Sequence, residues 1–435
     1  MKNLRVRIFT TDILALYLSL ILSVLVRGII HVHAVQNEAV WMSAHLYIFL
    51  PSFLFSLLAL YIAGLYELQI IYDRTKTVAL LLYTQVSTAI FSVLSFYILR
   101  TNLTPKLTIF LYVIFSVIIL SLTRSYILNA IQKREKFKAI FVGLDQNLMK
   151  NLEVLWAPFY FTYQDNLQNI DSQYVVYQEK ILNVENSLLL EKLKSEGKNV
   201  LSYNQYYEFL YKKIDLENFF YEDFMRQVGD AKETATHYIF RRIVDISCGL
   251  VVFPFFLLSL PFISLGIYLQ DKGRVIFSQD RVGYLGRIIK IYKIRTMTGV
   301  DSGGIVDAKK AESFVNKNGL TVTRFGMFLR KVRLDELPQC INLLNGTVSF
   351  IGPRVSAIGV HNDMIQNVKN FSLRLLIPQG LTGWAQVHMN IQPKTHAEHA
   401  ERLAYELYYI KHRSILLDIS IILKTIKTLL SREGA

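Results

Sequence analysis

The sequence contains little cysteine and little charge. Its 435 residues include only two cysteines, Cys248 and Cys340, which are too few for a disulfide scaffold and have no zinc-type ligands nearby. Charged residues make up 19% of the chain, whereas soluble proteins average roughly 25%. Apolar residues reach 52%, and the mean hydropathy is +0.30. This composition excludes an intrinsically disordered chain and indicates that part of the protein lies in lipid.

Acidic residues are scarce relative to basic ones. Lys and Arg number 48 against 34 Asp and Glu, which gives a net charge of +14. Most of this excess, net +12, falls from His237 onward. An excess of this size indicates an anionic partner, which can be nucleic acid, a membrane surface or a phosphorylated substrate.

Four long apolar runs occupy the first third of the chain. Each is close to the roughly 20 residues that a helix needs to cross the hydrocarbon core. We therefore predict a bundle of four transmembrane helices over residues 1–130. Asp12 and Arg27 lie near the ends of the first run, where we expect both side chains to reach the membrane interface. The predicted spans are 8–30, 39–66, 77–99 and 107–123.

Basic residues are distributed unevenly between the segments that connect these runs. They gather before the first span, between the second and third, and after the fourth, where Arg124 begins a basic stretch. The positive-inside rule places such segments on the cytoplasmic side. The N-terminus and everything after Arg124 are therefore predicted to be cytoplasmic.

Residues 137–222 have the pattern of a small α/β domain. The run Lys138 to Gly143 predicts a buried strand that ends in a glycine turn. A dinucleotide-binding loop needs three glycines at fixed spacing, and only Gly143 is present. We therefore predict a degenerate Rossmann-like domain that acts as a spacer, and we disfavour nucleotide binding.

A fifth uncharged run, residues 246–270, differs from the first four. It contains Pro254 and Pro261, and each proline predicts a kink or a break because it removes a backbone donor. A spanning helix would place one of its two basic flanks outside, against the positive-inside rule. We predict instead a re-entrant helix over residues 242–270 that returns to the cytoplasmic side. The flanking basic residues are Arg241 and Arg242 before the run, and Lys272 and Arg274 after it.

Two features of the remaining domain, residues 237–435, combine charge with a regular pattern. Basic and apolar residues alternate from Ile291 to Arg295, which predicts a half-buried strand with Lys293 and Arg295 on one side. Cations on a rigid strand suit phosphate oxygens. Further on, Asp335 and Glu336 precede Pro338, a residue typical of a first helical turn.

The two adjacent carboxylates permit two interpretations. At a helix start the dipole favours anions, and neighbouring side chains point in different directions, so that one carboxylate can attack while the other binds a metal. Alternatively, Asp335 caps the helix and Glu336 pairs with Arg333. Asn345-Gly346 predicts the end of this helix. A rigid turn then places Arg354 after Gly352-Pro353, and a later loop carries Gln386 into a strand.

Taken together and in order, these motifs resemble the bacterial sugar transferase family, the polyprenyl-phosphate glycosyl-1-phosphate transferases. The four spans and the middle domain resemble its large monotopic members, which implies a mixed α/β monotopic catalytic domain over residues 237–435. The chain departs from the family pattern at Leu257-Leu258, where a Ser-Pro break is usual, and at Thr347 and Val355, where Asp and Pro are usual. The matching segments are Arg242 to Asp245, Gln279 to Gly283, Tyr292 to Met297, Leu334 to Gln339, Gly352 to Arg354, Gly380 to Val387, and Leu417-Asp418.

The resemblance implies a two-step transfer in the bacterial inner (cytoplasmic) membrane. Asp335 would attack a UDP-sugar and release UMP, and the sugar phosphate would pass to undecaprenyl phosphate. This would be the first membrane step in assembling a surface polysaccharide (capsule, exopolysaccharide or O-antigen) or a glycoprotein glycan. Glu336 would hold Mg²⁺. The implied substrate-binding residues are Lys293, Arg295, Arg330, Arg354 and Gln386, and the implied membrane-anchoring residues are Arg241, Arg242, Asp245, Pro254 and Pro261.

The implied partners are therefore a UDP-sugar, undecaprenyl phosphate and membrane lipids, with no nucleic acid and with a homodimer possible. Two alternatives stay open: a membrane-anchored nucleotide-sugar dehydratase or epimerase, which would need the missing glycine-rich loop, and a non-enzymatic glycan-export scaffold. The sugar is not identified, and we expect the residues that select it between 301 and 320 and after Gln386. His396 and His399 are one helical turn apart, but neither His388 nor another third ligand has metal-site spacing, so that this segment predicts a polar helix face.

Overall fold

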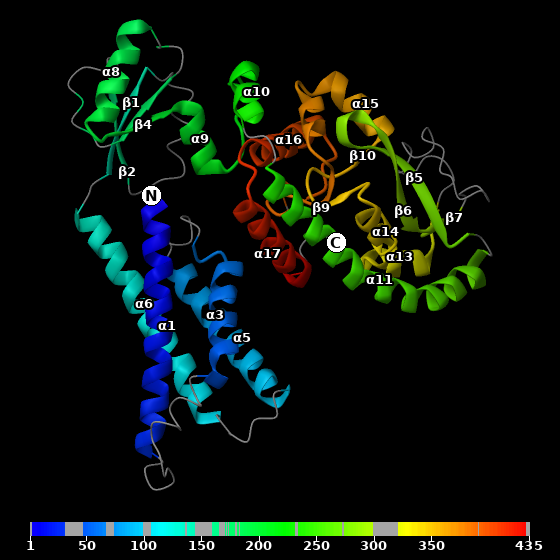
Figure 1. Cartoon of the computed structure of the whole chain (residues 1–435), viewed down its shortest axis with the longest axis horizontal. Helices are drawn as coiled ribbons and strands as arrows, with labels where there is room; N and C mark the ends of the chain where they lie inside the picture. The colour runs from blue at the N-terminus through cyan, green and yellow to red at the C-terminus, as the bar shows by residue number, and fades with distance from the viewer. Residues whose placement is uncertain are drawn as a thin grey trace. The chain divides into compact units, whose positions relative to one another are not determined.

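The structure is a computed structural model that divides into two units, Met1–Val200 and Leu201–Ala435, each described by itself (Figure 1). The residues that it describes are 2–30, 47–66, 74–98, 106–134, 137–143, 159–164, 170, 172, 174–178, 181, 183–230, 234–271, 274–298, 321–389 and 391–431.

The first unit begins with apolar helices. Three of them contain stretches long and apolar enough to cross a membrane, Val6–Ile29, Thr75–Ile98 and Lys106–Asn129. The second predicted span corresponds to a shorter helix, and residues 39–46 of that span lie outside the described residues. The helices are α1 (Lys2–Ile30), α3 (Leu50–Ile62), α5 (Arg74–Ile98) and α6 (Lys106–Arg134).

Three charged side chains within these helices have polar partners inside the bundle. Asp12 on α1 forms an ion pair with Arg124 on α6, with 2.5 Å between Oδ2 and Nη2. Arg27 donates to the hydroxyl of Thr108, also on α6, at 2.9 Å. Asp12 is 0% exposed and Arg27 is 8% exposed. The expectation that both reach the membrane interface is wrong, because each finds a polar partner inside the bundle.

The first unit also contains a four-stranded sheet in the order β2-β1-β3-β4. Strand β1 runs parallel to both β2 and β3, and it corresponds to the predicted buried strand. Gly143 follows β1 with φ near +64°, a left-handed conformation that favours glycine. This arrangement confirms an α/β segment, while its Rossmann-like character stays a prediction. The elements are β1 (Phe137–Val142), β2 (Phe159–Gln164), β3 (Tyr174–Tyr177), α8 (Val184–Ser195) and β4 (Asn199–Ser202).

The second unit begins with α9 (Tyr203–Tyr211) and α10 (Tyr221–Asp230). Helix α9 and the first two residues of α10 fall within the predicted middle domain, residues 137–222, and they group here with the C-terminal residues. Phe224 belongs to a core that also contains Trp384 and Leu407. Glu208 accepts a hydrogen bond from Lys411 at 2.6 Å, so a polar contact reinforces this packing.

Helix α11 (Ala235–Asp271) is a single helix of 37 residues with Pro254 and Pro261 inside it. Its stretch Ala235–Gln270 is also long and apolar enough to cross a membrane. The helix is not interrupted at either proline, and Figure 1 shows its axis bending toward the C-terminal end. A kink without a break is expected where proline removes a single hydrogen bond. The re-entrant course stays a prediction.

Short strands and helices follow α11. One sheet has the order β10-β5-β6, and β9 pairs in parallel with β11. The strands are β5 (Ile276–Val282), β6 (Ile288–Ile294), β7 (Met297–Thr298), β8 (Thr321–Val322), β9 (Ser349–Ile351), β10 (Ser356–Ala357) and β11 (Gly380–Thr382). The helices are η3 (Tyr284–Gly286), α13 (Arg324–Lys331), η4 (Leu334–Glu336), α14 (Gln339–Asn345), α15 (Ile358–Asn367), η5 (Phe371–Leu376), α16 (His396–Lys411) and α17 (Ile415–Ser431).

Candidate active site

The acidic pair lies in the short 3₁₀ helix η4, directly before α14. Arg333 precedes the pair with φ of +57°, so the chain turns sharply before the carboxylates. Helix α14 then begins after Pro338 and ends at Gly346, whose φ is +75°. The predicted helix start and end are therefore confirmed. No side chain caps η4 or α14, which disfavours the interpretation of Asp335 as a cap.

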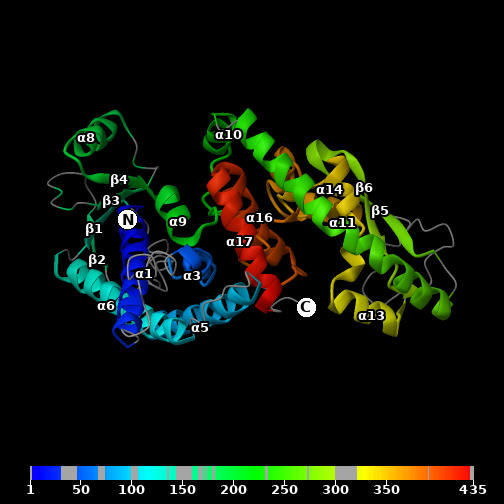
Figure 2. The same ribbon diagram turned by 60° about the horizontal axis from the view of Figure 1, so that its bottom comes forward.

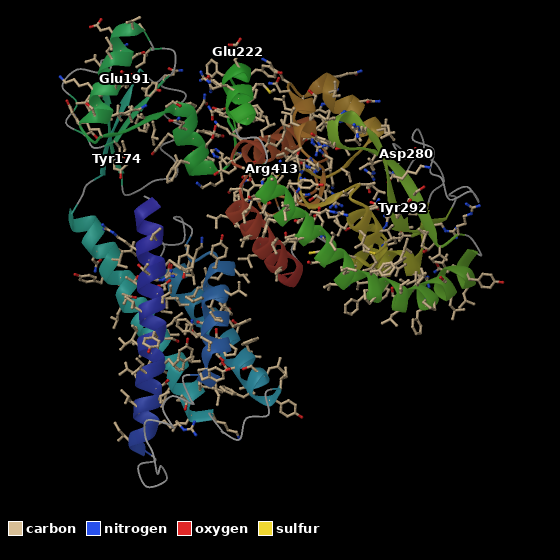
Figure 3. The ribbon with its side chains drawn as sticks, viewed as in Figure 1. Tyr174, Glu191, Glu222, Asp280, Tyr292 and Arg413 are labelled. Atoms are coloured by element: carbon tan, nitrogen blue, oxygen red, sulfur yellow. The ribbon has the colours of Figure 1, made fainter. Side chains whose placement is uncertain are left out.

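A β-hairpin supplies the cations. Strands β5 and β6 pair antiparallel, and the register places Gln279 opposite Ile291. Because side chains alternate between the faces of a strand, Arg281 shares the face of Gln279, and Lys293 shares the face of Ile291. Figure 3 marks the hairpin by Asp280 on β5 and Tyr292 on β6. The predicted half-buried strand around Lys293 is confirmed, but it ends at Ile294, so that Arg295 follows the strand and is not part of it.

Close backbone contact positions the turn that carries Arg354. A Cβ on Gly352 would lie 2.4 Å from the carbonyl oxygen of Pro378, and one on Gly380 would lie 2.1 Å from the nitrogen of Gly352. Only glycine permits strands β9 and β11 to approach this closely. The two glycine-containing motifs thus pack against each other and form one rigid unit.

Glu336 links the acidic pair to these cations. Its Oε1 accepts a hydrogen bond from Arg354 Nη2 at 3.1 Å and lies 3.6 Å from Lys293 Nζ. The predicted partner Arg333 is not the one that forms the ion pair. Among the residues that the structure describes, no side chain forms an ion pair or a hydrogen bond with the Asp335 carboxylate. Glu336 is therefore engaged, whereas Asp335 is available to react.

The surroundings of the two acids shift their pKa values in opposite directions. Burial and the neighbouring Glu336 raise the pKa of Asp335 above its usual value, although Lys293 and Arg330 oppose this shift. Burial also acts to raise the pKa of Glu336, but Arg354 and Lys293 outweigh it, so that the pKa lies below its usual value. Adjacent acids with separated pKa values are a feature of catalytic pairs.

A pocket opens beside Lys293 and Arg354 and contains a third cation, Arg281, that sequence reasoning did not select. Burial and nearby Arg354 lower the pKa of Arg281 to about 10. Its guanidinium donates to Gln279 at 2.6 Å, and no carboxylate in the described part of the chain forms an ion pair with it. Arg281 and Arg354 thus lie close together with few carboxylates to neutralise them, an arrangement that favours an anionic ligand. The pocket is lined by Arg281, Ile291, Lys293, Gln339, Arg354, Val355, Gly380 and Leu381.

Three predicted substrate-binding residues lie outside the lining of this pocket. Arg330 on α13 donates to the Thr296 hydroxyl at 2.9 Å, and its charge acts on Asp335. Arg295 is 8% exposed and follows β6. Both amide atoms of Gln386 are buried without a hydrogen-bond partner in the described structure. Arg330 therefore lies close enough to influence the acidic pair, whereas Arg295 and Gln386 are not brought to the pocket.

A buried ion cluster lies behind Arg354. Arg374 is 1% exposed and pairs with Glu406, which is 2% exposed, through bonds of 2.7 and 2.8 Å. Arg402 donates to the same carboxylate at 3.0 Å. Arg374 also donates to the backbone carbonyl of Arg354 at 2.7 Å. The cluster therefore holds the turn that directs Arg354 toward Glu336.

The five predicted membrane-anchoring residues all lie on α11. Pro254 and Pro261 are inside its apolar stretch. Arg241 lies over the ring of Tyr238, with 5.8 Å between Cζ and the ring centroid. Arg242 and Asp245 contact α14 and β9. An anchoring role for these residues stays a prediction.

An acidic pair surrounded by cations, next to a helix long and apolar enough to cross a membrane, is typical of a membrane-associated protein that acts on anionic substrates. Residues 236–432 match the family model described as bacterial sugar transferase. The chain is 35% identical over 204 residues to an exopolysaccharide production protein PSS of Rhizobium leguminosarum bv. phaseoli, covering 96% of that protein and 45% of this chain. The chain therefore belongs to the bacterial sugar transferase family.

Other relatives carry names that state a reaction. The chain is 31% identical over 215 residues to a UDP-N-acetylgalactosamine-undecaprenyl-phosphate N-acetylgalactosaminephosphotransferase of Aeromonas hydrophila, covering 48% of each chain. It is 32% identical over 198 residues to a UDP-glucose:undecaprenyl-phosphate glucose-1-phosphate transferase of Escherichia coli, covering 45% of this chain and 41% of that protein. The aligned part of the chain thus spans about half or less of the length of these two relatives.

Proposed function

We propose that the protein transfers a sugar 1-phosphate from a UDP-sugar to undecaprenyl phosphate in the bacterial cytoplasmic membrane and releases UMP. The observation that carries this proposal is the Asp335 carboxylate, which has no ion-pair or hydrogen-bond partner among the described side chains and directly precedes Glu336 in its cluster with Lys293 and Arg354. The names of the relatives support the substrate classes. A cytoplasmic site fits the basic segments that flank the predicted spans.

The first step is an attack by Asp335. One carboxylate oxygen bonds to the β-phosphorus of the UDP-sugar, and the bond from that phosphorus to the bridging oxygen breaks. UMP leaves with the bridging oxygen, and the sugar phosphate stays on Asp335 as an acyl phosphate. Two anions approach each other in this step, so that nearby cations are essential. Arg281, Lys293 and Arg354 supply them around the pocket.

The second step restores the carboxylate. A phosphate oxygen of undecaprenyl phosphate attacks the same phosphorus, the Asp335–phosphorus bond breaks, and the lipid diphosphate sugar leaves. No proton is gained or lost over the two steps. Because each step replaces one oxygen on phosphorus by another, one set of cations serves both.

The donor set also fits Mg²⁺, which typically binds one or two carboxylates together with substrate phosphates. Glu336 offers a carboxylate with lowered pKa that stays ionised at neutral pH, next to the cations that would hold the diphosphate. When bound there, the metal would neutralise phosphate charge. The protein's own contribution is to keep Glu336 ionised and oriented through Arg354 and Lys293.

UMP release from the full-length protein in detergent tests the proposal. A panel of UDP-sugars with undecaprenyl phosphate should identify a donor that yields UMP, and Asp335→Asn should abolish the release. Asp363→Asn is the matched control, since Asp363 on α15 is exposed and contacts His396. Release that persists in Asp335→Asn would contradict the covalent route, and absence of release with every donor would favour the scaffold alternative.

A further inference from the structure

Helix α11 carries a basic residue that caps α14. Arg242 donates from Nη1 to the carbonyl of Leu343 at 2.7 Å and from Nη2 to that of Leu344 at 2.5 Å. These carbonyls belong to the last turn of α14, and that of Leu343 also accepts a hydrogen bond from the Gly346 N–H at 3.2 Å. The Arg242 guanidinium thus supplies two further donors to these carbonyls and places a favourable charge at the negative end of the helix.

Helix α14 connects the end that Arg242 contacts with the acidic pair at its other end. Backbone hydrogen bonds run from Arg333 through Leu337 to Cys340, so η4 and α14 form one continuous helical run. Asn342, which is 1% exposed, also bonds the backbone of β6 on both sides of Ile291, at Lys290 and Tyr292. The position of α14 therefore sets the position of the acidic pair relative to the strand that carries Lys293.

One helical turn after Arg242, Asp245 contacts a different part of the site. Its Oδ1 accepts bonds from the Ser349 hydroxyl at 2.9 Å and from the backbone N–H of Phe350 at 2.6 Å. The carboxylate is 5% exposed, so that these donors would otherwise be buried without an acceptor. Both belong to β9, which leads directly into the turn that carries Arg354.

A third contact brings α11 and α14 together. A Cβ on Gly249 would lie 2.8 Å from Leu344, so this glycine permits close packing of the two helices. Figures 1 and 2 both show α11 running along α14. Helix α11 therefore packs against two segments of the site, one that carries the acidic pair and one that leads to Arg354.

We propose that Arg242 and Asp245 are positioning residues for the transfer reaction. They hold α14 and β9 on one face of α11 and thereby fix the distance between the acidic pair and Arg354. This role is distinct from the anchoring role that their place beside the apolar stretch suggests. The inference rests on the proposed function, because its readout is turnover of a UDP-sugar.

The first test removes the Arg242 cap from the full-length protein in lipid nanodiscs. Arg242→Ala should lower kcat for UMP release by about 10- to 100-fold, because a displacement of about 1 Å at a reacting group has that effect. The KM for the UDP-sugar should change by less than about threefold, since the pocket cations remain. Added guanidinium ion should restore part of kcat, whereas ammonium should not.

Arg274→Ala is the control, because it removes the same charge from the other flank of the same apolar stretch, at an exposed position. An anchoring role predicts equal losses in both variants and a smaller fraction of protein in membranes. Equal loss of turnover without guanidinium rescue would overturn the proposal, as would turnover of Arg242→Ala within twofold of the unmodified protein.

The second test compares Asp245→Asn with Asp245→Ala. The amide oxygen of Asn keeps an acceptor for Ser349 and Phe350, so that kcat should stay within about threefold, while Ala should lower it by about 10-fold or more. Equal activity of the two variants would contradict the proposal even where Arg242→Ala does not fold. Absence of UMP release by the unmodified protein would instead refute the proposed function.

Discussion

Glu406→Gln removes the negative charge at the centre of the buried ion cluster behind Arg354. Glu406 accepts bonds of 2.7 and 2.8 Å from Arg374 and of 3.0 Å from Arg402. The variant leaves two guanidinium groups close together, of which Arg374 is 1% exposed. Breaking a buried pair in this way costs about 3–5 kcal/mol.

The expected effect on thermal unfolding follows from this free energy. In a domain of 150–250 residues, 1 kcal/mol shifts Tm by about 2–4 °C, so that Glu406→Gln should lower Tm by roughly 6–20 °C. Differential scanning fluorimetry in detergent measures this shift. Turnover at a temperature below unfolding should also fall, because Arg374 donates to the carbonyl of Arg354.

Glu401→Gln provides the matched control. Glu401 lies on the same helix and pairs with Lys213 at 2.9 Å, but its side chain is 46% exposed. Surface pairs contribute at most about 1 kcal/mol, so that Tm should change by no more than about 4 °C. A Tm for Glu406→Gln that equals the control value would refute the assigned role of the cluster.

Further predictions concern the pocket, the acidic pair and α11. Arg281→Gln should lower kcat/KM for UMP release by roughly 10- to 150-fold, as expected for the loss of a charged hydrogen bond. The control Arg287→Gln, at an exposed position, should have little effect in the same assay. Equal effects of the two variants would exclude Arg281 from substrate binding. Because the pKa of Asp335 is raised and only its ionised form attacks, UMP formation should fall with decreasing pH through an inflection above the usual Asp value of about 3.9. Arg330→Gln should move that inflection to higher pH, since Arg330 lowers this pKa, and an unchanged pH–rate profile would count against the assignment. Two single-cysteine variants, Tyr238→Cys and Arg274→Cys, place a thiol at an exposed position on either side of the apolar stretch, in a background without Cys248 and Cys340. Both should react with an impermeant maleimide from the same side of the membrane. Labelling from opposite sides would show that α11 spans the membrane.

Sequence reasoning succeeded where the physical cause is local. Pro338 and Gly346 limit α14 because each residue acts on its own backbone conformation. The alternation around Lys293 predicted a strand because side-chain period is a property of the strand itself. In both cases the neighbours that matter lie within a few residues.

The contacts that sequence reasoning missed join distant parts of the chain. Arg281 reaches the pocket through the register of β5 against β6, which no single segment specifies. The pairing of Asp12 with Arg124 requires knowledge of which faces of α1 and α6 meet. Residues 301–320, where we expect part of the sugar selectivity, lie outside the described residues, and that prediction stays untested.

Peptide mass spectrometry of the protein with a UDP-sugar donor and no acceptor tests the central claim most directly. The proposed mechanism predicts a sugar-phosphate adduct on the peptide that contains Asp335, formed together with UMP and lost when undecaprenyl phosphate is added. Asp335→Asn should show no adduct. UMP release from the unmodified protein without any adduct, or an adduct on a different residue, would contradict the assignment of Asp335 as the nucleophile.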